Sequence, residues 1–241
     1  MEDISYEVVL KNAVTLPGVK INRQDFLGKE LKKYFPPETI QKAIETSPSN
    51  AGIPHQTIDT IAKGCIVYET NKVSAISFAT GIPGGFALFG TVPADLVQYF
   101  GHILRILQKL VYLYDWEDLF NDDAGMDDET TNLLTLFVGV MFGVNGATTV
   151  LTKIAQQASE KAYKTLMAKA LTKGTIYPIV KKIASTIGVK MTKEVFAKSV
   201  SKIVPVLGGV ASGGLTYVTY RPMASRLQKY LSEQDMVKSE N

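Results

Sequence analysis

The sequence predicts an all-α protein, built as a multi-helix bundle whose glycine-rich apolar helices pack closely together. Strand alternation is not sustained anywhere in the 241 residues, and apolar residues recur with helical spacing instead. Three uncharged stretches, residues 73–94, 130–152 and 203–220, each contain a GxxxG spacing. Both glycines of such a pair share a helix face, which another backbone can approach closely. The predicted packing glycines are Gly81, Gly85, Gly139, Gly143, Gly209 and Gly213.

The first fifty residues are predicted to form a small, polar helical appendage. Asn22 suits the N-cap of a helix over residues 22–35. Pro37 suits the first turn of a second helix, over residues 36–46, where a missing N–H costs least. Residues 47–56, SPSNAGIPHQ, are rich in turn-forming residue types and are predicted as a linker.

Residues 57–231 are predicted to form the main helical domain, followed by a polar tail at residues 232–241. Gly174 and Gly188 are expected to end two helices, because glycine adopts the left-handed conformation common just after a helix. The helices of this domain are predicted over residues 57–80, 93–114, 128–142, 147–172, 176–187, 193–204 and 210–231.

The three apolar stretches are long enough to cross a bilayer, which leaves two explanations open. Pro83 and Pro205 interrupt the first and the third, and Asn145-Gly146 interrupts the second. These interruptions favour the centre of a tightly packed helical protein, because they make each stretch a marginal membrane span. Insertion into a membrane, or conditional exposure there, is the alternative.

The net charge of +3 conceals two regions of opposite sign. Residues 115–129 contain eight acidic residues and no basic one, whereas residues 153–202 contain eleven lysines and two glutamates. One interpretation is that the two regions face each other or are merely solvated. The more specific hypothesis is that the lysine-rich region forms a basic surface for anionic lipid or another polyanion. Lysine without arginine favours diffuse attraction, and we expect no nucleic-acid partner. The lysines proposed for this surface are Lys161, Lys164, Lys169, Lys173, Lys181 and Lys182.

Metal-ligating residues are scarce. Cys65 is the single cysteine, and His55 and His102 are the two histidines, so we expect no metal site. The glycine runs match no phosphate-binding loop, and we expect no cofactor. The N-terminus carries acidic residues where a secretion signal needs basic ones. With a lone cysteine, which suits a reducing compartment, this predicts a cytoplasmic protein.

One predicted helix, residues 93–114, carries polar side chains in a line. They recur every three or four residues on an otherwise apolar helix. The simpler interpretation is a solvent-facing stripe. The alternative is a polar seam inside the bundle, where a carboxylate, an imidazole and a guanidinium meet a polar ligand, with His102 as a candidate acid or base. The seam consists of Asp95, Gln98, His102, Arg105 and Lys109, of which the first four are the candidate ligand-binding residues; no catalytic residue is assigned.

Two segments carry a family resemblance. The first is PADLVQYFGHILRILQKLVYLYDW at residues 93–116, and the second is KIVPVLGGVASGGLTYVTYRPMASRLQKYL at residues 202–231. Together they resemble the EcsC protein family, over roughly residues 57–231. In that family asparagine often follows the run of small residues, whereas this chain has Thr216-Tyr217 there. The resemblance implies an all-helical bacterial protein, intracellular or peripheral to a membrane, and supplies no catalytic residue.

Three functions follow as hypotheses. The leading one is a non-enzymatic protein at the cytoplasmic face of the inner membrane, with an anionic membrane surface or a membrane protein as partner. A link to a transport or secretion system is implied by the EcsC resemblance alone. The second is a soluble helical enzyme or ligand-binding protein whose site is the polar seam. The third is a pore-forming or immunity-type helical protein. The sequence leaves the oligomeric state open.

Overall fold

The computed structural model describes residues 5–79, 88–89, 92–120, 127–156, 177–191 and 212–239. Within these ranges the fold is helical apart from one antiparallel pair of two-residue strands, which confirms the predicted all-α class. The helices are α1 (Tyr6–Val14), α2 (Arg23–Leu31), α3 (Pro37–Glu45), α4 (His55–Ala79), α5 (Ala94–Leu113), α6 (Asp128–Met141), α7 (Ala147–Gln156), α9 (Tyr177–Met191) and α11 (Ser212–Ser239). The strands are β1 (Leu88–Phe89) and β2 (Val92–Pro93).

Several helix starts follow from single residues. The Asn22 side chain accepts a hydrogen bond of 2.9 Å from the Asp25 backbone N–H, which confirms it as the cap of α2. Pro37 occupies the first turn of α3 as predicted. Asp127 caps α6 by accepting from the Thr130 N–H at 2.7 Å. Side-chain oxygens thus supply acceptors that the first turns of α2 and α6 would otherwise lack.

Other boundaries differ from the predicted ones. No helix was predicted before residue 22, yet α1 is present. Gly188 does not end a helix, because α9 continues through it to Met191. α11 runs well into the predicted polar tail, where Ser232 is buried. The helix predicted over residues 193–204, the second half of the one over residues 147–172, and Gly174 lie outside the described residues.

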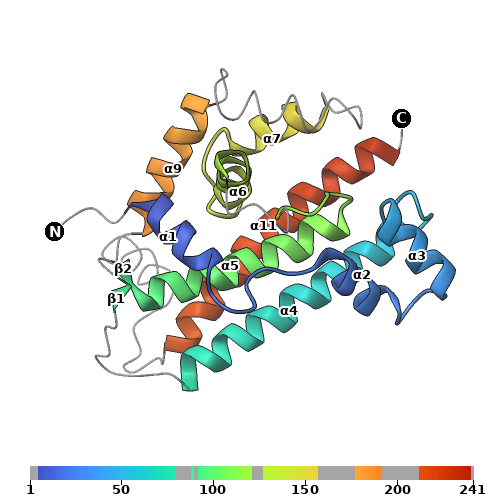
Figure 1. The fold of residues 1–241 in the computed structure, drawn as a ribbon, viewed down its shortest axis with the longest axis horizontal. Coiled ribbons are helices and arrows are strands. Elements are labelled where there is room, and N and C mark those ends of the chain that lie inside the picture. The colour runs from blue at the N-terminus through green and yellow to red at the C-terminus, as the bar shows by residue number, and fades with distance from the viewer. Residues whose placement is uncertain are drawn as a thin grey trace.

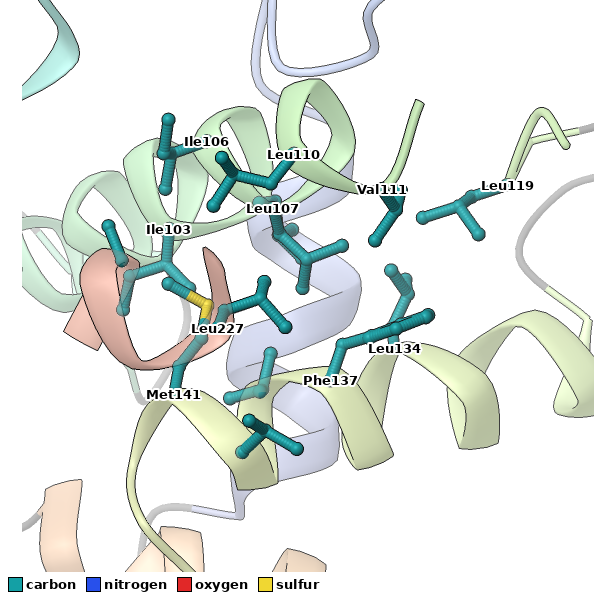
Figure 2. Packing of buried hydrophobic residues seen from close by; sticks show 14 of the residues in the cluster. Ile103, Ile106, Leu107, Leu110, Val111, Leu119, Leu134, Phe137, Met141 and Leu227 are labelled. Carbon is teal, nitrogen blue, oxygen red and sulfur yellow. The ribbon is translucent and has the colours of Figure 1, made fainter. Parts of the chain in front are cut away.

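Three long helices form the centre of the molecule. α4, α5 and α11 lie side by side, running obliquely across the view in Figure 1, and α4 makes its most extensive contact with α11. α1 packs against α5 and α9, while α6 packs against α11, α7 and α9. Figure 2 shows Leu107 of α5, Phe137 of α6 and Leu227 of α11 pointing toward one another in the resulting core.

α6 is buried around its whole circumference between residues 134 and 141. A helix that is apolar on every side belongs in a protein interior or in a membrane. Here neighbouring helices cover it, so the apolar stretch at residues 130–152 supplies core helices α6 and α7. Within the described ranges, no helix combines the length and the apolar character that crossing a membrane requires.

The residues predicted as an appendage contribute to this same core. Val9 and Leu10 of α1 and Leu27 and Leu31 of α2 are fully buried and belong to one cluster with the side chains of α5. α1 and α2 both contact α5 directly. Their apolar faces are therefore covered by the central helices.

Gly139 lies at a close contact between helices. It is buried in α6, and a Cβ atom placed on it would lie 2.7 Å from Ile183 Cγ2 and 3.0 Å from Ala147 Cβ. Distances this short leave no room for a side chain. The atoms that close on Gly139 belong to side chains of α9 and α7, whereas the GxxxG pattern predicts another helix backbone there.

Gly143 does not share that role, and the prediction for it is corrected. It is exposed, has a φ of +62° and lies just after the C-cap of α6, Phe142. Its N–H donates to the Val140 carbonyl at 3.0 Å, and the Val144 N–H donates to the Gly139 carbonyl at 2.8 Å. This pair of bonds is a Schellman motif, which needs a residue at positive φ. Gly143 therefore terminates a helix.

The remaining predicted packing glycines cannot be placed in this way. Gly81, Gly85 and Gly209 lie outside the described residues, and Gly213 lies in the first turn of α11, where only the backbone is described. A glycine that the sequence analysis did not single out, Gly101 of α5, does permit a close approach. A Cβ on it would lie 3.1 Å from both Leu16 Cδ1 and Val19 Cγ2.

Candidate functional site

The polar seam of α5 turns from the surface into the interior. Gln98 is exposed, His102 and Arg105 are partly buried, and Lys109 is buried. Only the backbone of Asp95 is described. The simpler interpretation, a stripe facing solvent along the whole helix, is therefore wrong for the C-terminal half of the seam. The polar side chains there need partners within the protein.

The carboxylate at this place comes from Glu69 of α4. Its side chain is fully buried, and Lys109 Nζ lies 2.6 Å from Glu69 Oε1. Arg105 Nη2 lies 3.4 Å from the same oxygen. We refer to Glu69, His102, Arg105 and Lys109 as the charge cluster. Two cations share one oxygen of a single carboxylate, so these three charged groups carry a net charge of about +1.

The α1–α2 connection holds the cluster from one side. Residues 15–22, here called the strap, run along α5 at Gly101. Arg105 Nη1 donates to the Gly18 carbonyl. The Gln108 side chain donates to the Val19 carbonyl at 2.8 Å and accepts from the Ile21 N–H at 2.8 Å. These bonds fix the Arg105 guanidinium between the strap and Glu69.

Aromatic rings and a further helix complete the surroundings. The Lys109 ammonium lies 5.7 Å from the centre of the Phe26 ring and 5.4 Å from that of the Tyr68 ring. Both rings offer a negative face to the cation. Tyr68 is 59% exposed and forms the outer wall. The Tyr220 hydroxyl of α11 donates to the His102 carbonyl at 3.0 Å, which ties the third central helix to the cluster.

Three buried polar atoms of the cluster have no hydrogen-bond partner in the part of the chain that the structure describes. They are Glu69 Oε2, His102 Nδ1 and Arg105 Nε. A buried polar atom without a partner costs about 1–3 kcal/mol, and more when the group is charged. Most buried polar groups in proteins are paired for this reason. Three such exceptions therefore lie on neighbouring side chains of the cluster.

The protonation states at the cluster follow from burial and from its neighbours. Burial lowers the pKa of His102, the positive charges of Arg105 and Lys72 lower it further, and Glu69 opposes them in part. Burial alone would raise the pKa of Glu69. The hydrogen bond and charge of Lys109, together with Arg105, outweigh burial and hold that pKa below its usual value. At neutral pH the cluster thus contains a carboxylate, two cations and a neutral imidazole.

A second polar network joins the other end of the three central helices. Asp59 Oδ1 of α4 accepts from the Tyr114 hydroxyl at 2.5 Å and from Gln228 Nε2 of α11 at 3.1 Å. Ser232 Oγ lies 3.1 Å from His55 Nε2. Burial raises the pKa of Tyr114, and the hydrogen bond to Asp59 raises it further. These side chains bind one another, so we infer that the network fixes the positions of the three helices relative to each other.

An open cleft of about 530 Å³ lies between the end of α6, the start of α7 and α11. Arg226 and Lys229 are among its lining residues, with Glu233 beside them. Arg226 donates to the Met141 carbonyl at the C-terminus of α6, and Lys229 lies 3.8 Å from Glu233. The charged groups of this cleft are thus engaged within the protein.

Of the lysines predicted to face an anionic surface, two can be placed. Lys181 and Lys182 are exposed on α9, and Lys181 Nζ lies 3.0 Å from Glu7 Oε1 of α1. Lys181 is therefore partly neutralised by its partner. The other four, Lys161, Lys164, Lys169 and Lys173, lie outside the described residues. Among the side chains that the structure describes, no group of three or more His, Cys, Asp or Glu residues gathers around a possible metal position.

Comparison with protein-family models, with curated proteins and with solved structures finds no match. The resemblance to the EcsC family accordingly stays a prediction from the two quoted segments.

Proposed function

We propose that this protein binds a small polar molecule at the charge cluster and acts without catalysing a reaction. The observation that carries the proposal is the fully buried Glu69, whose Oε2 has no partner among the described residues. On the adjoining helix, Arg105 Nε and His102 Nδ1 likewise have no partner in the described part of the chain. A ligand that pairs these three atoms would remove a desolvation cost that the free protein carries.

The cluster is also held in place before any ligand arrives. Lys109 and the strap fix Glu69 and Arg105 from two sides, and Tyr220 fixes the backbone at His102. A site whose groups are already positioned loses less conformational entropy on binding. Convergent polar groups on rigid helices are typical of small-molecule sites.

The ionisation behaviour favours binding over acid–base catalysis. A general acid or base works best when its pKa lies near the working pH. The pKa of His102 is lowered away from neutrality by burial and by the nearby cations, and Glu69 is kept ionised by Lys109 and Arg105. The cluster therefore presents fixed charges and dipoles, which suit recognition.

Equilibrium dialysis against a pool of small polar metabolites, read by mass spectrometry, tests this proposal. We expect the wild-type protein to retain one compound or a few related ones. Glu69→Gln should lose them, because it removes the negative charge and replaces one acceptor oxygen by an amide nitrogen that can only donate. Glu7→Gln is the matched control, since it removes one carboxylate from the exposed pair with Lys181. Retention of nothing by the wild type, or equal retention by the Glu69 variant, contradicts the proposal.

A second candidate function, at an anionic membrane surface, is favoured by α9. Its outward side presents Ile179, which is 41% exposed, and Lys182 one turn further along. An apolar side chain beside a lysine suits an interface between lipid headgroups and water. The lysine-rich sequence on either side of α9 adds positive charge.

Sedimentation with vesicles checks this second candidate. We expect binding to vesicles that contain anionic lipid, weakened by salt and by Lys182→Glu. Lys32→Glu, an exposed lysine at the end of α2, is the control with the same change in charge. Equal binding to neutral and anionic vesicles would show that the lysines do not direct the protein to anionic lipid.

A further inference from the structure

We propose that the ligand of the charge cluster is a small oxyanion that also carries a hydroxyl group, as hydrogen phosphate and 2-hydroxycarboxylates do. This inference rests on the proposed binding function and specifies the chemistry of the ligand. It follows from the charge of the cluster, from the kinds of atom left unpaired and from their closeness.

The charges around Glu69 are unbalanced. Arg105 and Lys109 both approach Oε1, and Glu69 is the one carboxylate paired with them among the described residues. The side chain of Lys109 is 11% exposed and that of Arg105 is 20% exposed, so water screens this excess weakly. An uncompensated positive charge of this kind is costly and attracts an anion. The exposed Lys72, whose charge acts on His102, adds to the attraction.

The guanidinium supplies the donor for that anion. Arg105 Nη1 binds the Gly18 carbonyl and Nη2 approaches Glu69. Nε is the nitrogen left over, and it can only donate. A carboxylate or phosphate oxygen is the acceptor that pairs best with an arginine nitrogen, because the bond is charge-assisted.

Glu69 imposes the second requirement. Its Oε2 is an ionised acceptor without a partner among the described residues, so the ligand has to offer it a hydrogen. An anion that carries no hydroxyl would place a second negative oxygen against Oε2. Since Arg105 Nη2 lies 3.4 Å from Glu69 Oε1, Nε and Oε2 belong to groups in direct contact. The hydroxyl and the anionic oxygen of the ligand must then lie as close to each other as these two protein groups do. They can be attached to one phosphorus atom or to adjacent carbon atoms.

The two histidines allow a direct test on the wild-type protein. In protein labelled at histidine, the imidazole NMR signals of His102 and His55 are assigned with His102→Gln. Glycolate, acetate and phosphate are then titrated at constant pH and ionic strength, with sodium chloride as the reference salt. His102 belongs to the cluster and its buried Nδ1 has no partner among the described residues, whereas His55 Nε2 binds Ser232 at the far end of α4.

We expect saturable movement of the His102 signal with glycolate or with phosphate, and a steady His55 signal. Glycolate against phosphate distinguishes a hydroxycarboxylate from a phosphate ligand. Acetate, which lacks the hydroxyl, should bind at least about tenfold more weakly than glycolate, the loss expected for one hydrogen bond to a charged group. Equal binding of acetate and glycolate overturns the hydroxyl requirement.

Two further outcomes separate this inference from the proposed function. If no anion moves His102 while dialysis retains a neutral or cationic compound, the oxyanion inference is wrong and the binding function stands. If dialysis also retains nothing, the binding function itself fails. Arg105→Lys, which keeps the charge and removes Nε, should weaken glycolate binding, whereas Lys32→Gln on α2 should leave it unchanged.

Discussion

Lys109 of α5 and Glu69 of α4 form an ion pair in the interior, with Nζ 2.6 Å from Oε1. The pair joins two central helices at a point where Glu69 is completely shielded from solvent. Charges withdrawn from water lose hydration, and their mutual attraction repays that loss only in part. Removing one partner should therefore be much worse than removing both.

Substitution of the pair by methionine tests this expectation. Glu69→Met leaves Lys109 and Arg105 without a counter-charge and should lower the free energy of unfolding by about 3–5 kcal/mol. The double variant Glu69→Met/Lys109→Met should recover much of that loss. Urea unfolding of the wild type, both single variants and the double variant completes the cycle. Losses that simply add in the double variant would mean that the two charges do not depend on each other.

Substitution at Gly139 measures the tightness of the α6 contact with α9. Gly139→Leu forces a side chain against Ile183 and Ala147 and should cost about 1–3 kcal/mol or more. Gly139→Ala should also destabilise, since its Cβ would already lie 2.7 Å from Ile183. Gly64→Ala is the matched control in an exposed position of α4 with open space around it, and should stabilise by up to about 1 kcal/mol. Thermal melting measures both variants. A melting temperature of Gly139→Ala as high as that of Gly64→Ala would contradict the close contact at Gly139.

The stability of variants at Gly143 should depend on whether the new residue tolerates a positive φ, and not on the size of its side chain. Its φ of +62° costs about 1–2 kcal/mol for a residue with a Cβ, so Gly143→Ala is expected to destabilise by roughly that amount. Gly143→Asn should be milder, because asparagine tolerates the left-handed region. The midpoint of urea unfolding for both variants checks the order. If alanine and asparagine prove equally harmless, the Schellman turn does not depend on glycine.

The lowered pKa of His102 makes a prediction about pH. Because the folded value lies below the ordinary 6.5, the unfolded chain binds a proton first as the pH falls. Stability should then be greatest above pH 6.5 and decline as the pH falls toward the folded value. The free energy of unfolding, measured from pH 7.5 to 5.5, should fall less in His102→Gln than in the wild type. A parallel decline in both would show that other groups cause it.

Local signals in the sequence predicted much of the fold. Asn22 and Pro37 mark helix starts through one side chain or one missing N–H, and both lie where expected. α1 was missed because it is short and its apolar face becomes evident only against α5. Gly188 was misplaced as a stop because nothing in the sequence distinguishes a helix-ending glycine from one within a helix. We infer that contacts with other helices determine both the formation of α1 and the continuation of α9 through Gly188.

The candidate site was predicted from one helix, whereas its carboxylate comes from another. His102, Arg105 and Lys109 are recognisable as a polar line on α5, but the partner Glu69 lies on α4. A signal for Glu69 does exist in the sequence. It occurs at helical spacing from the buried Cys65 and from the other apolar residues of that stripe, so a charge falls where core residues are expected. Which cation it meets depends on how the helices pair, and spacing along one helix does not contain that information.

A crystal structure of the protein soaked with glycolate tests most directly whether the charge cluster is a ligand site. We predict density for the anion beside Arg105 Nε, with its hydroxyl within hydrogen-bond distance of Glu69 Oε2 and with His102 Nδ1 at its edge. Water alone at this position, with glycolate absent or bound only elsewhere on the molecule, would contradict the account.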